Sequence, residues 1–107
     1  MSLLVEMHCR PLAGVPPLTA AEVAGRLAEI PGWALVDDAL ERRFDFADFH
    51  QTMAFVNAVA WIAHREDHHP DLAVGYNRCT LRYRTHSLGG ISVNDLICAA
   101  KVNALLA

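Results

Sequence analysis

The sequence predicts a two-layer α+β domain built on an antiparallel sheet, and three observations support this fold class. Three segments place apolar residues at the spacing of three and four that is typical of helices. Four short segments have strand character, and three of them alternate apolar and polar residues. The predicted strands come in two pairs, and each pair is joined by a turn too short for a crossover, so the paired strands are antiparallel. The predicted order is α-β-β-α-β-β-α.

The chain begins with an arm that we expect to be extended and partly ordered at best, because residues 1–17 carry three prolines and no sustained periodicity. A single domain is expected over residues 18–107, a length near the commonest domain size. Thr19 and Glu22 form a capping-box pattern that starts the first helix, and Pro31–Gly32 ends it. The apolar residues of this helix are Val23, Leu27 and Ile30.

The first strand pair is predicted at residues 33–36 and 40–46, around a turn at Asp37–Asp38. A long helix follows from about residue 48 to residue 66, and it is apolar on more than one face. In a chain this small, a helix that is apolar nearly all round has two explanations. Either a partner subunit covers the second face, or the helix is buried in the centre of the domain.

In the second half of the chain, apolar residues recur at every second position, which predicts strands at residues 72–76 and 79–83. Asn77–Arg78 is the expected hairpin turn between them. A flexible loop is expected at Gly89–Gly90. Residues 92–95 then repeat the capping-box pattern and start the final helix.

Composition excludes several classes of protein. With 53% hydrophobic and 20% charged residues, the chain is globular rather than disordered. The net charge of −3 and the lack of any block of Lys or Arg argue against a nucleic-acid partner. The three cysteines are odd in number and form no C-x-x-C, which fits a reducing compartment. No apolar run has the length of a membrane span or of a signal-peptide core, so we expect a cytoplasmic protein without a membrane partner.

Titratable residues gather in one segment, HREDHHP at residues 64–70, and His86 lies further along the chain. Three kinds of chemistry compete for these residues. His64 and His68 are one helical turn apart and, with His86, suggest a metal site. An imidazole that donates and accepts protons near neutrality suggests general acid–base catalysis. The His-His-Pro sequence also suits a purely structural helix end.

The residues favour proton chemistry slightly and leave the alternatives open. The segment lacks the H-E-x-x-H order of zinc proteases, and no fourth metal ligand is evident. Covalent catalysis has little support, because G-x-S-x-G is absent and Cys79 is the one cysteine near the cluster in sequence. A helix end accounts for one histidine better than for an adjacent pair with His86 beyond it.

The segment from residue 64 to residue 95 resembles the signature of the pterin-4a-carbinolamine dehydratases. That signature has a polar residue, a His-His-Pro sequence, an aromatic residue, a histidine and an aspartate at fixed spacing. In this chain these are His64, His68-His69-Pro70, Tyr76, His86 and Asp95. The sequences Gly32-Trp33 and FDFADFHQTMAFVNAVAWIA also resemble the family, so the resemblance covers roughly residues 18–107.

The resemblance implies a four-stranded antiparallel sheet with helices packed on one face, and a homodimer or homotetramer. It implies a lyase, a 4a-hydroxytetrahydrobiopterin dehydratase, that removes water from a 4a-hydroxytetrahydropterin to give the quinonoid dihydropterin in pterin recycling. No cofactor and no metal are implied. The reaction needs an acid for the departing hydroxyl and a base for the proton on the neighbouring ring nitrogen.

Carried over residue by residue, the resemblance gives three active-site histidines: His68, His69 and His86. We expect His68 and His86 to form the acid–base pair and His69 to hydrogen-bond the pterin ring. Asp95 matches the signature aspartate. It is expected either to orient one imidazole and stabilise its protonated form, or simply to cap the last helix.

Two further residues are assigned by position alone. Trp33 is expected to bind substrate at the flank of the pocket, unless it is a core residue. His64 stands where the family usually has glutamate, so it is given only a supporting role. An alternative function is a non-catalytic module for protein binding, dimerisation or assembly, because relatives use the same fold in that way. The presence of all three histidines favours the enzyme.

Overall fold

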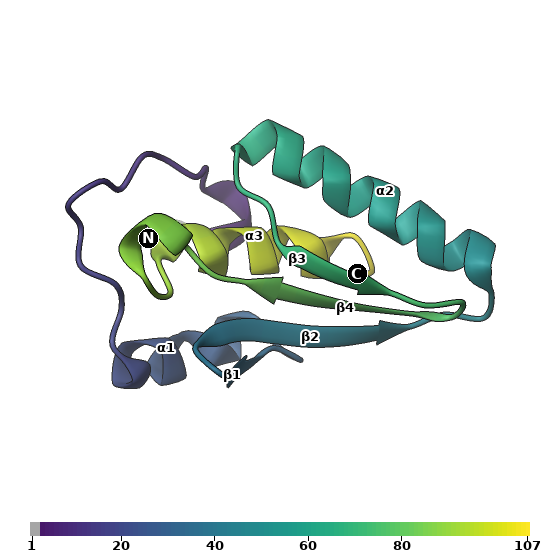
Figure 1. Ribbon diagram of the computed structural model, residues 1–107, viewed down its shortest axis with the longest axis horizontal. Coiled ribbons are helices and arrows are strands. Elements are labelled where there is room, and N and C mark those ends of the chain that lie inside the picture. The colour runs from purple at the N-terminus through teal and green to yellow at the C-terminus, as the bar shows by residue number, and fades with distance from the viewer. Residues whose placement is uncertain (1–2) are drawn as a thin grey trace.

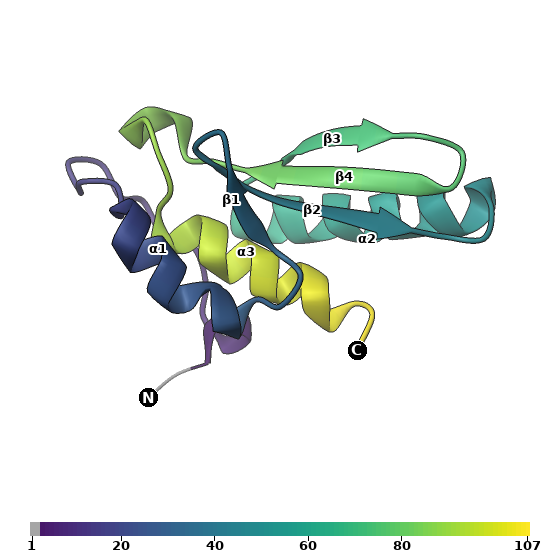
Figure 2. The same ribbon diagram turned by 90° about the horizontal axis from the view of Figure 1, so that it is seen from below.

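The computed structural model describes residues 3–107 and confirms the predicted fold class (Figure 1). A four-stranded antiparallel sheet in the order β1-β2-β4-β3 forms one layer, and the helices pack against it (Figure 2). The strands are β1 (Ala34–Val36), β2 (Ala39–Asp45), β3 (Asp71–Val74) and β4 (Arg78–Tyr83). The helices are α1 (Ala20–Arg26), α2 (Phe49–Glu66) and α3 (Val93–Ala104), with 3-10 turns η1 (Leu4–Glu6), η2 (Leu27–Glu29) and η3 (His86–Leu88).

The helices begin and end where polar side chains and special backbone conformations allow it. The predicted capping box at the start of α1 is present, because Glu22 N–H donates to Thr19 Oγ1 and Thr19 N–H donates to Glu22 Oε1. Asp48 caps α2 by accepting from the backbone N–H of residue 51. That helix ends at Glu66, and Asp67 adopts a left-handed conformation with φ 50°. His68 therefore lies beyond the helix and does not continue the face that carries His64.

Two short turns set the register of the sheet. Asp37 and Asp38, with φ 47° and 63°, make the predicted two-residue turn between β1 and β2. The turn between β3 and β4 differs from the prediction, because it comprises residues 75–77 and Gly75 N–H donates to Arg78 O. Arg78 belongs to the ladder, where it is paired with Asp45 of β2.

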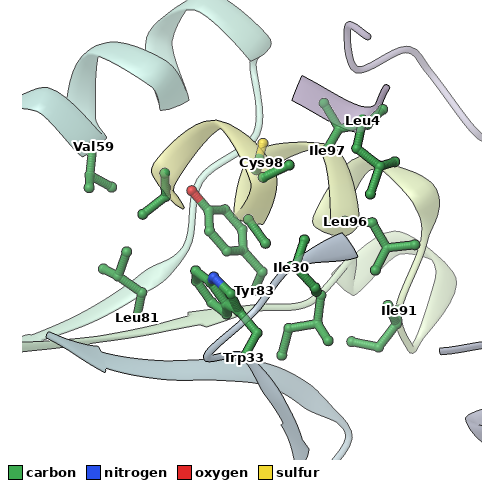
Figure 3. Close-up of a cluster of buried hydrophobic side chains, with 14 of the residues drawn as sticks. Leu4, Ile30, Trp33, Val59, Leu81, Tyr83, Ile91, Leu96, Ile97 and Cys98 are labelled. Atoms are coloured by element: carbon green, nitrogen blue, oxygen red, sulfur yellow. The ribbon is translucent and has the colours of Figure 1, made fainter. Parts of the chain in front are cut away.

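The core lies between the sheet and the helices. Leu81 and Tyr83 of β4 point into it together with residues of α3, and Figure 3 shows them beside Trp33. The indole of Trp33 packs against the Tyr83 ring at 5.7 Å between centroids, and its Nε1–H donates to Asn103 Oδ1 at 2.8 Å. The opposite face of the sheet is charged, with Arg82 donating to Glu41 across the β2–β4 pair.

The N-terminal segment departs from the expectation of a partly ordered arm. Leu4 is buried in the core and η1 packs against α3. Lys101 of α3 donates from Nζ to Val5 O at 2.9 Å. The segment then runs extended around one end of the molecule before it reaches α1 (Figure 1). Its partners are distant in sequence, and a local pattern of prolines gives no sign of them.

Exposed apolar side chains lie on the helix α2 and on the edge strand β3, among other places. On α2 these are Phe49 and Trp61, and on the edge strand β3 they are Leu72 and Val74. The alternative that α2 is buried in the centre of the domain is therefore wrong. None of the helices within residues 3–107 is both long enough and apolar enough to span a bilayer.

Candidate active site

His68 and Asp95 form a hydrogen-bonded pair at the end of the sheet where α2 stops and α3 starts. His68 Nε2 lies 2.6 Å from Asp95 Oδ1. Since an ionised carboxylate only accepts hydrogen bonds, Nε2 carries the proton and donates it. The neutral imidazole then has its lone pair on Nδ1. The side chain of Asp95 is fully buried and that of His68 is 14% exposed.

The first turn of α3 fixes the other oxygen of the Asp95 carboxylate. Asp95 Oδ2 accepts from Thr85 Oγ1 at 2.8 Å and from Ser92 N–H at 2.9 Å. The second bond belongs to the capping box of α3. Both expected contacts of Asp95 are therefore present in the same carboxylate, because one oxygen caps the helix and the other meets an imidazole. A buried carboxylate with three donors is held in one orientation.

The ring of His68 is also held from its flat side. It stacks on the ring of Tyr83, with centroids 6.0 Å apart and planes inclined by 12°. The backbone N–H of His68 donates to Ala63 O at 3.2 Å, which ties the residue to the last turn of α2. The imidazole is thus positioned by its backbone, by its ring face and by one nitrogen.

His69 and His86 lie at the same end of the sheet as this pair. The strand β3 begins two residues after His69, and β4 ends three residues before His86. Because Asp71 pairs with Arg82 in antiparallel register, both histidines flank the same end of the β3–β4 pair. Both are exposed, and His69 Nδ1 lies 3.4 Å from the carbonyl oxygen of the residue that follows it.

The loop after His86 is more ordered than the sequence suggests. Thr85 forms an isolated bridge with Gly90, whose backbone is buried. Between them, His86 starts η3, and Gly89 ends it with φ 70°. The expected flexible loop is thus a closed one that presents His86 beside the start of α3.

Two of the residues assigned by position lie away from the pair. Trp33 is 5% exposed within the core, so its core alternative describes its place. His64 is exposed on α2, with its ring 5.4 Å from that of Trp61. Within residues 3–107, no three His, Cys, Asp or Glu side chains are grouped so as to hold a metal ion.

A pocket of about 300 Å³ opens beside the His68–Asp95 pair, a volume at the lower end for small-ligand sites. Its wall includes His68, Asp67 and Thr85, and it does not include His69 or His86. The other side of the pocket comes from the N-terminal segment and from α3. Residues of these two parts that line it are Cys9, Arg10, Pro11, Leu12 and Asn94. No role was predicted for any of them from the sequence.

Comparison with known proteins identifies the family. The family model described as Pterin 4 alpha carbinolamine dehydratase matches residues 16–105. This chain belongs to that family. A relative from Nitrosomonas eutropha named "Putative pterin-4-alpha-carbinolamine dehydratase" is 53% identical over 105 residues, 96% of this chain and 93% of the relative. A relative of the same name from Xanthomonas campestris is 54% identical and covers 95% of this chain and 89% of its own length.

Solved structures of pterin-4a-carbinolamine dehydratase relatives have the same fold. A Brucella melitensis protein described as a transcriptional coactivator/pterin dehydratase superposes with a TM-score of 0.81 at 35% identity, covering 85% of this chain and 99% of its own. A pterin dehydratase-like protein described as a RuBisCO assembly factor in the alpha-carboxysome gives 0.56 at 27% identity, covering 68% of this chain and 84% of its own. The resemblance found in the sequence is thus confirmed at the level of family and fold.

Proposed function

We propose that this member of the family dehydrates a 4a-hydroxytetrahydropterin to the quinonoid dihydropterin by histidine acid–base catalysis. The observation that carries the proposal is the hydrogen-bonded His68–Asp95 pair at the wall of a ligand-sized pocket, within the family's histidine signature. Tetrahydrobiopterin recycling is the pathway that the 4a-hydroxytetrahydrobiopterin substrate would serve. The side chains on this surface can bind, donate and accept protons, which is the chemistry that a dehydration requires.

In the proposed reaction His68 is the base. Its Nδ1 accepts the proton from the pterin nitrogen next to C4a, and the buried carboxylate of Asp95 stabilises the imidazolium that forms. The electron pair left on nitrogen forms the C=N bond as the C4a–O bond breaks. His86, which is exposed between the pocket-lining residues Thr85 and Ser87, gives a proton to the departing hydroxyl, which leaves as water. His69 holds the pterin ring by a hydrogen bond at Nε2, the nitrogen that does not face its neighbouring carbonyl and that accepts when Nδ1 carries the proton.

The test follows spectroscopically the decay of an enzymatically generated 4a-hydroxytetrahydropterin. We expect His68→Ala and His86→Ala each to lower kcat by about 10²-fold, the lower bound for loss of a general acid or base. His50→Ala, at an exposed histidine on α2, is the matched control and should retain full activity. If the wild-type protein does not accelerate the reaction over the spontaneous rate, the proposed function is excluded.

A non-catalytic binding function is the second candidate, and one observation favours it. The solved relatives include a protein described as a coactivator and another described as an assembly factor. Exposed apolar side chains on α2 and β3 would serve such binding as well.

We propose instead that a second copy of this chain covers these apolar side chains, giving a cytoplasmic homodimer or homotetramer. The three cysteines are free thiols, in keeping with that compartment.

A further inference from the structure

The N-terminal segment forms one wall of the pocket that contains His68. Four consecutive residues, 9–12, line it together with His68 and Thr85. This segment precedes the histidine signature by more than fifty residues in the chain. Nevertheless it is anchored to the body of the protein by side chains that leave it little freedom beside the pocket.

Asn94 provides the first anchor. Its Oδ1 accepts from Arg10 N–H at 3.2 Å, and its Nδ2 donates to Arg10 O at 2.8 Å. The amide thus pairs with both backbone groups of one residue, as a neighbouring strand would. Asn94 is 7% exposed, so the loss of either bond would leave a buried polar atom without a partner.

Glu66 provides the second anchor. Its Oε1 accepts from Cys9 N–H at 2.7 Å, and its Oε2 lies 3.0 Å from His8 Nδ1. Lys101 Nζ stands 4.0 Å from the same carboxylate. The side chain of Glu66 is 5% exposed, which makes these bonds to a charged acceptor strong ones.

Both anchors stand next to the residues of the histidine–aspartate pair. Glu66 ends α2 two residues before His68, and Asn94 immediately precedes Asp95 in the first turn of α3. The turns that hold the two halves of the pair therefore also hold the segment. As a result, the distance between the segment and the imidazole is fixed by two rigid helix ends rather than by the loop itself.

We propose that Asn94 and Glu66 are positioning residues that hold residues 9–12 as a substrate-binding wall of the pterin pocket. The inference rests on the proposed function, because the wall is assigned to the same site. Pro11 and Leu12 give this wall apolar surface, and the backbone of Cys9 and Arg10 is already paired with the anchors. The wall contacts the pterin ring and takes no part in proton transfer.

The first test measures the kinetics of Asn94→Ala. Because the wall binds the ground state and the transition state alike, KM should rise about tenfold while kcat stays within about twofold of wild type. Asn94→Asp keeps an acceptor for Arg10 N–H but sets a carboxylate oxygen against Arg10 O, so it should also raise KM. Asn57→Ala, at an exposed asparagine on α2, is the control. Folded variants of Asn94 with an unchanged KM would overturn the proposal.

The second test restores the segment by a different bond. Cys9 Sγ lies 3.6 Å from Cys98 Sγ of α3, and Cys9, the less buried of the two thiols, is the one that the diazene oxidant diamide would reach first. The two thiols lose their hydrogens to diamide, which becomes a hydrazine, and the S–S bond forms. Cross-linking of Asn94→Ala, verified by mass spectrometry, should return KM towards the wild-type value, and Cys9→Ser should abolish that rescue. Complete cross-linking without rescue would contradict the positioning role.

Direct binding separates this proposal from the dehydratase assignment. The probe is a stable 7,8-dihydropterin, titrated by fluorescence into wild type and Asn94→Ala. If the wild type binds it without catalysing dehydration, the catalytic proposal fails and a tenfold weaker binding by the variant still supports the wall. Equal affinities overturn the wall alone, and absence of binding by the wild type overturns both.

Discussion

Asp95 is the residue on which the geometry of the site converges, because its buried carboxylate accepts from His68, Thr85 and Ser92. In Asp95→Asn the amide presents an NH₂ group to a site built of donors. If that group faces His68, the ring must take the other tautomer and lose its free Nδ1. We expect kcat to fall by about 10²-fold or more. ¹⁵N NMR of the histidine ring would report the tautomer, and unchanged activity would contradict the role given to the pair.

Tyr83 stacks on the ring of His68, but its hydroxyl group makes no hydrogen bond within the residues that the structure describes. The phenol oxygen is buried without a hydrogen-bond partner, and burial raises the pKa of the phenol far above its ordinary value. Removing an unpaired buried hydroxyl relieves a desolvation cost. Tyr83→Phe should therefore leave the free energy of unfolding unchanged or raise it by up to about 1 kcal/mol. Urea denaturation measures this, and a clear loss of stability would reveal a missing partner.

At single positions, the sequence predicted candidate residues but not the contacts that they make. The resemblance to the family signature predicted His68 and Asp95 as site residues, but only the fold shows that they contact each other. The Pro-Gly pair before Trp33 fits a substrate-binding residue and a core residue equally well. Its burial against Tyr83 depends on how the strands pair, which the local sequence does not show. His64 and His68 are one helical turn apart in the sequence and were expected on one face. Asp67 adopts a left-handed conformation and ends the helix between them.

At the scale of elements, Glu66 links α2 to the N-terminal segment through a charge. Burial alone would raise its pKa, but hydrogen bonds from Cys9 and His8 and the charge of Lys101 bring the pKa below its ordinary value near 4.5. A lowered folded-state pKa stabilises the protein above the unfolded value, and this stabilisation is lost as the pH falls through the folded one.

The comparison of wild type with Glu66→Gln tests this linkage. Glutamine keeps an acceptor for Cys9 N–H but carries no charge. The free energy of unfolding of wild type should exceed that of the variant most at neutral pH. The difference should shrink as the pH is lowered below about 4.5 and towards the lowered pKa. Urea titrations across this range measure it. A difference that does not vary with pH would show that the charge of Glu66 contributes nothing.

Elements with a local cause were predictable, and those with a distant cause were not. Capping residues placed the starts of α1 and α3, and two aspartates placed the turn before β2. The turn after β3 comprises residues 75–77 rather than 77–78, because Arg78 pairs with a strand more than thirty positions earlier. The N-terminal segment was missed for the same reason, since Glu66 and Asn94 hold it from other elements.

At the scale of the whole molecule, the candidate site and the exposed apolar residues lie on different parts of the surface. The end where α2 stops carries the histidines, the pocket and the N-terminal wall. The side formed by α2 and the edge strand β3 carries exposed apolar residues instead. An unpaired edge strand with apolar side chains is a surface that folded proteins normally cover. The proposed second copy would cover it and leave the pocket end open to substrate.

Two valines with the same exposure allow this association to be tested. Val74 on β3 and Val15 in the N-terminal segment are each 45% exposed. A lysine on an edge strand opposes pairing with another chain, so Val74→Lys should lower the mass measured by light scattering at equal concentration. Trp61→Glu on α2 should act in the same direction, whereas Val15→Lys should match wild type. A wild-type protein that is monomeric at tens of micromolar would exclude the oligomer. If both lysine variants dissociate equally, charge rather than the edge of the sheet controls assembly.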